Sequence, residues 1–265
     1  MNNEIEIKES VINKYAEIAT ATSGCGCCCG EKSTTSDCNT MQEDYSNLDG
    51  YVKDADMGLG CGVPTEFAGI KNGDTVIDLG CGAGNDIFIA RPLVGEEGKL
   101  IGIDFTNEMI EKANKNKAKL GFENVEFKLG EIENLPLKNN SGNVIISNCV
   151  LNLVPNKQKA FSEIYRVLKS CGHFCVSDIV IKGILPEKLK KSAEMYAGCI
   201  SGAIQQDEYL EIIKQTGFKN IEIKKTKIIE LPDNVLINYL DEEEIKTFRN
   251  NEMGIFSITV VGYKN

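Results

Sequence analysis

The chain has 265 residues, a formal net charge of −10 from 39 acidic and 29 basic side chains, and an ordinary globular share of apolar residues, 42%. That length predicts one large α/β domain with an appendage, able to fold without disulfides. The negative charge repels phosphate backbones and anionic lipid, and every apolar run is shorter than a spanning helix, so we expect no nucleic-acid partner and no membrane partner.

The first elements along the chain are a helix and two loops. Apolar side chains at helical spacing predict an amphipathic helix over 8–20. Residues 20–47 are polar and cysteine-containing, with hardly an aliphatic side chain, which is typical of a loop. A glycine-rich loop, GLGCGVP, follows at 58–64. The amino terminus lacks the basic and apolar regions of a secretory signal, so we expect a cytoplasmic protein.

Strands and helices then alternate strictly. Aliphatic runs predict strands at 75–79, 99–104, 125–129, 144–147 and 173–181, and helical patterns lie between them at 85–94, 106–120 and 155–168. This order requires right-handed crossovers and a parallel sheet. A longer helical segment at 186–216 precedes two strands, at 221–230 and 255–263, which we expect at an antiparallel edge. The predicted division is a segment 1–64 with the cysteine-rich and glycine-rich loops, a Rossmann-like core 65–183, and a part 184–265 with a helical insertion and the last strands.

The turn after the first core strand has the features of a nucleoside site. Gly80, Gly82 and Gly84 alternate between a strand and a helix, where glycines let the backbone approach a ligand. Asp104 ends the next strand, 20 residues after Gly84, and a carboxylate there can accept both ribose hydroxyls. Asp78 lies just before the glycines, where it would repel a pyrophosphate but would suit a cation. A sulfonium that carries an α-ammonium group fits this pattern better than a dinucleotide.

These residues, VIDLGCGAG, resemble motif I of class I S-adenosylmethionine-dependent methyltransferases, and 101–113, 125–136 and 146–153 resemble later motifs of that group. The resemblance implies a mostly parallel sheet with an antiparallel edge strand, and S-adenosylmethionine as the cofactor. It implies that Asp104 binds the ribose and that Met109 packs on the adenine, unless that methionine belongs to the core. The other implied cofactor contacts are Glu131 and Ile132 beside the adenine, Asp78, Gly80 and Gly82 at the methionine portion, and Asn148 after the fourth strand.

Eleven cysteines stand beside a single histidine, His173. In a reducing cytoplasm such thiols stay reduced and can bind or react. Cys61 lies in the glycine-rich loop, Cys149 directly follows the fourth strand, and Cys199 lies among small residues in YAGCISGA. Taken singly, each is better explained as a small buried apolar residue than as a ligand. Five more are clustered between 25 and 38.

Together, GLGCG, SNCVLNL and YAGCISGA resemble the arsenite S-adenosylmethionine methyltransferases, a family whose members detoxify arsenic. The resemblance implies that Cys61, Cys149 and Cys199 bind trivalent arsenic, with arsenite and methylated arsenicals as substrates. It also implies a redox cysteine near the amino terminus, a role open to Cys27, Cys28 or Cys29, and a thiol reductant such as thioredoxin or glutathione. The resemblance does not assign a role to four further cysteines, Cys25, Cys38, Cys171 and Cys175.

Two alternatives remain open at this point. The chain could methylate carbon or oxygen of a small metabolite while its cysteines are merely buried. It could also be a thiol-rich metal-binding or metal-sensing protein that kept the fold, because Cys25 and Cys28 have the spacing of zinc ligands, although a second such pair at finger spacing is missing. Arsenic chemistry agrees with the scarcity of histidine, because the arsenic lone pair attacks a methyl group without the help of a general base.

Overall fold

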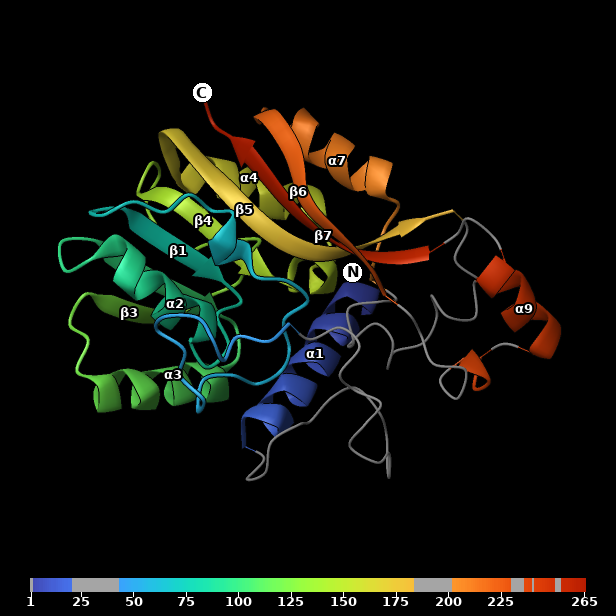
Figure 1. The fold of residues 1–265 in the computed structure, drawn as a ribbon, viewed down its shortest axis with the longest axis horizontal. Helices are drawn as coiled ribbons and strands as arrows, with labels where there is room; N and C mark the ends of the chain where they lie inside the picture. Colours follow the sequence, from blue (N-terminus) through green and yellow to red (C-terminus); the bar gives the residue numbers. More distant parts are fainter. Residues whose placement is uncertain (1, 21–42, 184–201, 230–235, 240, 251–253) are drawn as a thin grey trace.

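The computed structural model describes residues 2–20, 43–183, 202–229, 236–239, 241–250 and 254–265. Their centre is one seven-stranded sheet in the order β3-β2-β1-β4-β5-β7-β6 (Figure 1). Strands β1 to β5 pair in parallel, and β7 pairs antiparallel with both β5 and β6. The strands are β1 Thr75–Leu79, β2 Lys99–Asp104, β3 Val125–Leu129, β4 Gly142–Asn148, β5 Leu168–Lys182, β6 Lys219–Ile229 and β7 Gly254–Tyr263.

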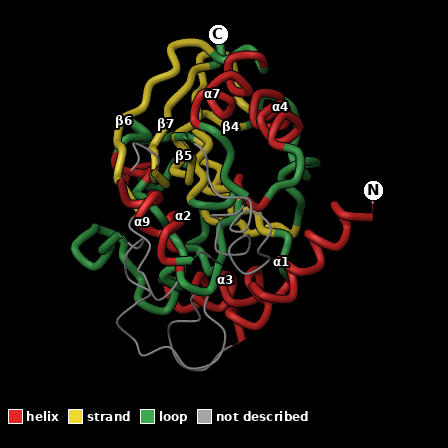
Figure 2. Tube along the Cα trace, turned by 90° about the vertical axis from the view of Figure 1, so that its right-hand side faces the viewer, coloured by secondary structure: helices red, strands yellow, loops and turns green. Residues whose placement is uncertain are grey.

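Helices cover both faces of this sheet. On one face, Ile87 and Phe88 of α2 belong to an apolar cluster with Val76 and Val144 of the sheet. On the other face, α4 and α7 contribute to a second cluster, in which Phe161 of α4 joins Ile77 and Ile145. Helices α4 and α7 lie side by side, and α1 lies against α3 (Figure 2). The described helices are α1 Asn2–Thr20, η1 Pro64–Glu66, α2 Asn85–Val94, α3 Asn107–Leu120, η2 Leu151–Leu153, α4 Lys157–Val167, α7 Gln206–Gln215 and α9 Glu242–Asn250.

The strand order creates a crevice at the carboxyl ends of β1 and β4. From β1 the chain moves outward through β2 to β3, and then returns to place β4 on the other side of β1. The turns that leave β1 and β4 therefore diverge, and ligands of open α/β folds bind at this kind of reversal. Helix α1 lies beside the same edge of the sheet (Figure 1). The glycine turn after β1 and the Cys149 turn after β4 consequently face the same space.

The predicted alternation of strands and helices is confirmed, and so are the parallel sheet and its antiparallel edge. At that edge, the chain's last strand, β7, is inserted between β5 and β6, so β6 is the outermost strand. Strand β5 begins at Leu168, five residues before the expected start, and a bulge around Cys171 separates this first part from the regular pairing with β4 that starts at His173. Of the helix expected at 186–216, residues 186–201 lie outside the described residues, 202–205 are not helical, and α7 forms the last part.

Helix α9 was not predicted. Its sequence, EEEIKTFRN, has too few apolar residues for a clear helical pattern, although three glutamates in the first turn suit the positive end of a helix dipole. None of the helices in the described part of the chain combines the length and the apolar character that a bilayer-spanning segment needs.

Candidate active site

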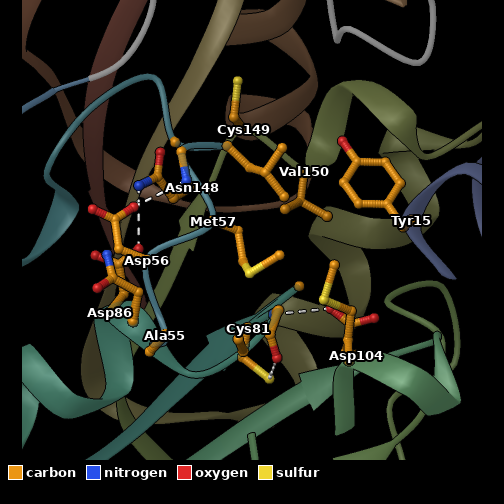
Figure 3. Close-up of a pocket in the computed structure, with 18 of the residues that line it drawn as sticks. Tyr15, Ala55, Asp56, Met57, Cys81, Asp86, Asp104, Asn148, Cys149 and Val150 are labelled. Atoms are coloured by element: carbon orange, nitrogen blue, oxygen red, sulfur yellow. Dashed lines mark hydrogen bonds between the residues drawn. The ribbon is translucent and has the colours of Figure 1, made fainter. Parts of the chain in front are cut away.

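A pocket of about 780 Å³ lies at the crevice between the carboxyl ends of β1 and β4. The glycine turn after β1, the end of β2, the turn after β4, the loop 55–60 and Tyr15 of α1 form its walls. Figure 3 shows Asp56, Asp86 and Asn148 on one side of the pocket and Asp104 on the opposite side. Segments from distant parts of the sequence therefore converge on one cavity.

The glycine turn leaves backbone exposed to the pocket. The amides of Gly80 and Cys81 donate to the carbonyl of Ile103, at 2.7 and 3.0 Å, which fixes the turn on β2. Gly80 and Gly82 both have positive φ, 73° and 51°. A Cβ at Gly80 would lie 2.5 Å from a methyl group of Val150, whereas one at Gly82 would meet only the sulfur of Met109, at 4.0 Å. Gly82 thus borders open space that a ligand can occupy.

Asp104 is at the junction of this pocket with a second one. Its Oδ2 accepts from the amide of Gly82 at 3.0 Å, and its Oδ1 accepts from the amide of Thr106 at 2.9 Å. Burial raises the pKa of the carboxyl group, and these backbone hydrogen bonds act in the opposite direction. The structure thus holds the carboxylate at the position where the sequence predicts a ribose ligand.

The second pocket, of about 480 Å³, lies on the other side of Asp104 and has mainly apolar walls. Glu131 and Ile132, the predicted neighbours of the adenine, both line it. Helix α1 closes one side through Lys8, whose Nζ lies 2.7 Å from a carboxylate oxygen of Glu131 and 2.6 Å from one of Glu133. An apolar pocket next to a buried carboxylate has the polarity that suits a purine attached to a ribose.

The first pocket is strongly acidic. Asp56, Asp86 and Asp104 line it, and no lysine or arginine is among the described residues on its walls. Burial raises the pKa of Asp86 to about 6. Asp78 is buried behind the wall, 2% exposed, and burial together with the charges of Asp86 and Asp104 holds its pKa well above the usual value. A cation in the pocket relieves this crowding of carboxylates, and a phosphate group would add to it.

Of the two aspartates on either side of the glycine turn, Asp86 lines the pocket wall and Asp78 does not. The sequence predicts that Asp78 faces the methionine portion of the cofactor, and the structure places it outside the lining residues. The two side chains differ because Asp78 still belongs to β1, whereas Asp86 lies in the first turn of α2. Met109 and Asn148 do line the pocket, and Met109 is also completely buried.

Two of the three predicted arsenic ligands lie in one apolar cluster. Cys149 lines the pocket and has φ = +60°, an unfavourable conformation for a residue with a side chain, and its amide donates to the carbonyl of Ser177 at 2.8 Å. Cys61 is 1% exposed and belongs to the same cluster as Cys149. Ala203 joins this cluster four residues after Cys199, which itself lies outside the described residues.

The other cysteines fall into two groups. Cys175 is buried in β5, where its thiol donates to the carbonyl of Pro64 at 3.2 Å and burial raises its pKa to about 12, while Cys171 is exposed at the bulge. The predicted redox cysteines Cys27, Cys28 and Cys29, with Cys25 and Cys38, lie outside the described residues.

Sequence reasoning missed several residues of the pocket wall. Cys81 lies inside the glycine motif, where the pattern indicates no separate role for it, and Asp86 lies where the pattern indicates only the start of a helix. Tyr15 is on the apolar side of the helix expected at 8–20. This position indicates that the side chain is buried, but it does not indicate which part of the protein packs against it. Tyr45 and Asp56 belong to a segment without a periodic pattern, so the sequence offered no signal for them.

Comparison with known proteins identifies the family. A model described as a methyltransferase domain matches residues 70–217, more than half of the chain. A crystal structure of an arsenic(III) S-adenosylmethionine methyltransferase from Chlamydomonas reinhardtii matches with a TM-score of 0.65 and 33% identity, covering 77% of this chain and 67% of that one. The chain belongs to the methyltransferase-domain family and, within it, to the arsenite methyltransferase family.

Curated sequences of this family agree. An arsenite methyltransferase from Halobacterium salinarum is 42% identical over 229 residues, which are 82% of this chain and 59% of that protein. The arsenite methyltransferase of Homo sapiens is 39% identical over 152 residues, 54% of this chain and 40% of that protein. The chain spans about half the length of the curated relatives it matches.

Proposed function

We propose that this chain transfers methyl groups from S-adenosylmethionine to trivalent arsenic, first to arsenite and then to methylarsenite, and thereby detoxifies arsenic. The observation that carries the proposal is the position of Cys149. Cys149 lines an acidic pocket suited to a cation, and it belongs to the same apolar cluster as Cys61. A soft ligand for the substrate thus lies beside a site for a positively charged methyl donor.

The residues of the two pockets suit the proposed cofactor. S-Adenosylmethionine supplies an electrophilic methyl group on a positively charged sulfur. Asp104 would accept the ribose hydroxyls between the pockets, and Glu131 and Ile132 would border the adenine. Asp86 would favour the α-ammonium group, with Asp78 adding negative potential from behind. The open space at Gly82 allows the backbone to approach the ligand closely.

For the substrate, we assign Cys61, Cys149 and Cys199 as thiolate ligands. Arsenite is a soft, thiophilic centre, and three thiols replace its three hydroxyl groups with release of three water molecules. The arsenic lone pair stays free and forms the new bond to carbon as the methyl–sulfur bond breaks. The nucleophile has no proton to lose, so the pocket needs no general base, and its main contribution is to hold the reacting atoms in line.

A redox step must follow each transfer, because methylation formally oxidises arsenic to the pentavalent state. Two thiols of the chain would return two electrons and form a disulfide, and Cys27, Cys28 and Cys29 are the candidates. A thiol reductant of the thioredoxin or glutathione type would then reopen this bridge. We therefore place the protein in the cytoplasm, where such reductants keep thiols reduced.

The test is to incubate the purified chain with S-adenosylmethionine, arsenite and a thiol, and to separate the arsenic species by chromatography. We expect methylarsenicals from the wild type and none from Cys149→Ser. Transfer of the methyl group to a small carbon or oxygen acceptor, with arsenite left unchanged, would support a metabolite methyltransferase instead. Tight zinc binding without any methyl transfer would support the metal-binding alternative.

A further inference from the structure

The backbone around Cys61 is held by hydrogen bonds from three distant parts of the chain. Asn148, at the end of β4, accepts from the amide of Cys61 at 3.1 Å and donates to the carbonyl of Gly62 at 2.8 Å. The hydroxyl of Tyr45 donates to the same carbonyl at 2.5 Å. From β7, the hydroxyl of Ser257 donates to the carbonyl of Cys61 at 2.6 Å. The loop that carries this cysteine is therefore not free to move independently of the sheet.

Close packing on both sides of the cysteine adds to this restraint. A Cβ on Gly60 would lie 2.7 Å from the amide nitrogen of Asn148, and one on Gly62 would lie 2.5 Å from the hydroxyl of Ser177. Both positions need glycine because the loop lies directly on β4 and β5. The glycines of GLGCG thus have a packing role: they bring the backbone of Cys61 within hydrogen-bonding distance of Asn148.

The polar groups that hold the loop are themselves buried and connected. Tyr45 is 3% exposed, and its hydroxyl accepts from Asn148 at 2.6 Å. Burial, followed by the charges of Asp86 and Cys61, raises the pKa of Tyr45, so its hydroxyl keeps the proton that it donates. Asn148 also donates to Asp86 on α2 at 3.1 Å. Buried hydrogen bonds of this kind are costly to break, because the remaining partner stays unsatisfied.

We propose that Asn148, Tyr45 and Ser257, named here the Cys61 clamp, are positioning residues that set the distance of Cys61 from Cys149 and thereby decide whether the chain accepts arsenite. Asn148 is suited to this role because it is linked to both cysteines. It precedes Cys149 in the chain, and its side chain accepts a hydrogen bond from the amide of Cys61. The inference rests on the proposed function.

The consequence is a change in substrate selectivity. On the proposed function, arsenite has three replaceable ligands and needs Cys61 as the third thiolate, whereas methylarsenite has two and does not need Cys61. Loosening the clamp therefore penalises arsenite more than methylarsenite. A role in folding alone would lower both activities together.

The first test measures the position of Cys61 without any turnover. Tyr45→Phe and Ser257→Ala each remove one hydroxyl, and Tyr165→Phe, on α4 at the opposite face of the sheet, is the matched control. We expect alkylation of Cys61 by iodoacetamide, followed by peptide mass spectrometry, to become about threefold or more faster in the two clamp variants, the scale of one lost hydrogen bond. Cys175, buried in β5, serves as the internal reference for unfolding and should not change.

The second test measures kcat/KM for arsenite and for methylarsenite in the same variants. The ratio of the two should fall about threefold or more in each clamp variant and stay at the wild-type value in Tyr165→Phe. An unchanged ratio, or an unchanged alkylation rate of Cys61 in both clamp variants, overturns the inference. If one variant exposes Cys175 as well, the other decides, because Ser257 acts from β7 and Tyr45 from the amino-terminal loop. Faster alkylation of Cys61 in a chain that never methylates arsenic would overturn the proposed function and leave the clamp in place.

Discussion

The site has two sides, a cofactor side with the glycine turn and Asp104 and a thiol side with Cys61 and Cys149, and they are built in different ways. The glycine turn joins β1 directly to α2, so the residues that form it are neighbours in the sequence and the turn conformation follows from the glycines themselves. Cys61 and Cys149 come from separate loops, and they share one apolar cluster because the Cys61 loop lies on β4 and β5 and is tied down by Asn148. A local motif can therefore be recognised from its residues alone, whereas the thiol site depends on the whole fold.

The two sides also differ in polarity. The cofactor side has carboxylates that are buried and crowded, with pKa values raised by loss of solvation. The thiol side is an apolar cluster that includes Ile179, Ile181 and Ile255 around the two cysteines. Negative charge favours a cationic methyl donor, and an apolar surrounding favours a neutral arsenic–thiolate adduct. The division of charge thus matches the division of labour that we propose.

The largest expected effect separates the thiols from one another. Cys149→Ser and Cys199→Ser should abolish methylation of both arsenite and methylarsenite, because the serine hydroxyl is a hard ligand and is not ionised at neutral pH. Cys61→Ser should stop the first methylation and still convert methylarsenite to the dimethyl product. Chromatography of the arsenic species from each variant with each substrate gives the answer. Normal arsenite methylation by Cys61→Ser, or activity of Cys149→Ser on either substrate, would contradict the three-thiolate site.

The next effect should be confined to the cofactor side. Asp104→Ala should weaken the binding of S-adenosylmethionine by about 1.5–3 kcal/mol, the usual scale for charge-assisted hydrogen bonds, while arsenite binding hardly changes. Isothermal titration calorimetry measures the first quantity and thiol titration the second. Asp54→Ala is the control, since this carboxylate is exposed, forms an ion pair with Lys119 and is not among the residues that line the pocket. Cofactor affinity equal to that of the wild type would remove Asp104 from the site.

The buried carboxylates also predict how stability depends on pH. Burial raises the pKa of Asp86 to about 6 and that of Asp178, which lies in β5 and accepts a hydrogen bond from Tyr209 of α7, to about 7. At these two groups the folded state binds more protons than the unfolded state between about pH 4 and 7, and their contribution to stability falls as the pH rises through this range. Without cofactor, the melting temperature should be lower at pH 7.5 than at pH 5.

Asp178→Asn sharpens this prediction. The amide carries no charge, so the decrease in melting temperature should become smaller in the upper part of the range, whereas cofactor binding should keep its pH dependence through Asp86. The stabilisation by S-adenosylmethionine should grow as the pH rises past about 6, because the cation favours ionised carboxylates. Calorimetric melting curves with and without cofactor measure both effects. A melting temperature that rises with pH in the absence of cofactor would be inconsistent with the raised pKa values.

The smallest effect on stability is expected in the amino-terminal cysteine cluster. Its sequence is polar and rich in glycine, and such segments contribute little to a core, so replacing Cys25, Cys27, Cys28 and Cys29 together by serine should leave the melting temperature nearly unchanged. The first methyl transfer should survive, and repeated turnover should stall for lack of an internal reductant. Rapid-quench measurement of product per enzyme separates these phases. Unimpaired multiple turnover would remove the cluster from the redox step.

Much of the fold could be predicted because its signals are local. Strands β1, β2 and β3 and helix α2 have the bounds that the aliphatic runs and glycines indicate, since each element is ended by a turn residue or by a change in polarity. The bulge in β5 and the place of β7 could not be predicted in the same way. Pairing partners are chosen by the sheet as a whole, and the period of a strand does not say which neighbour it will have.

For this protein, the sequence by itself determined the order of the elements, the glycine turn with Asp104 at the end of the next strand, and the three cysteine contexts that resemble arsenite methyltransferases. Only the tertiary structure decided that Asp86 rather than Asp78 reaches the pocket wall, that α1 closes the second pocket, and that Asn148 holds Cys61. The physical reason is the range of the interactions. Backbone conformation and periodicity are set by neighbours along the chain, whereas burial, raised pKa values and hydrogen bonds between loops arise only when distant segments pack together.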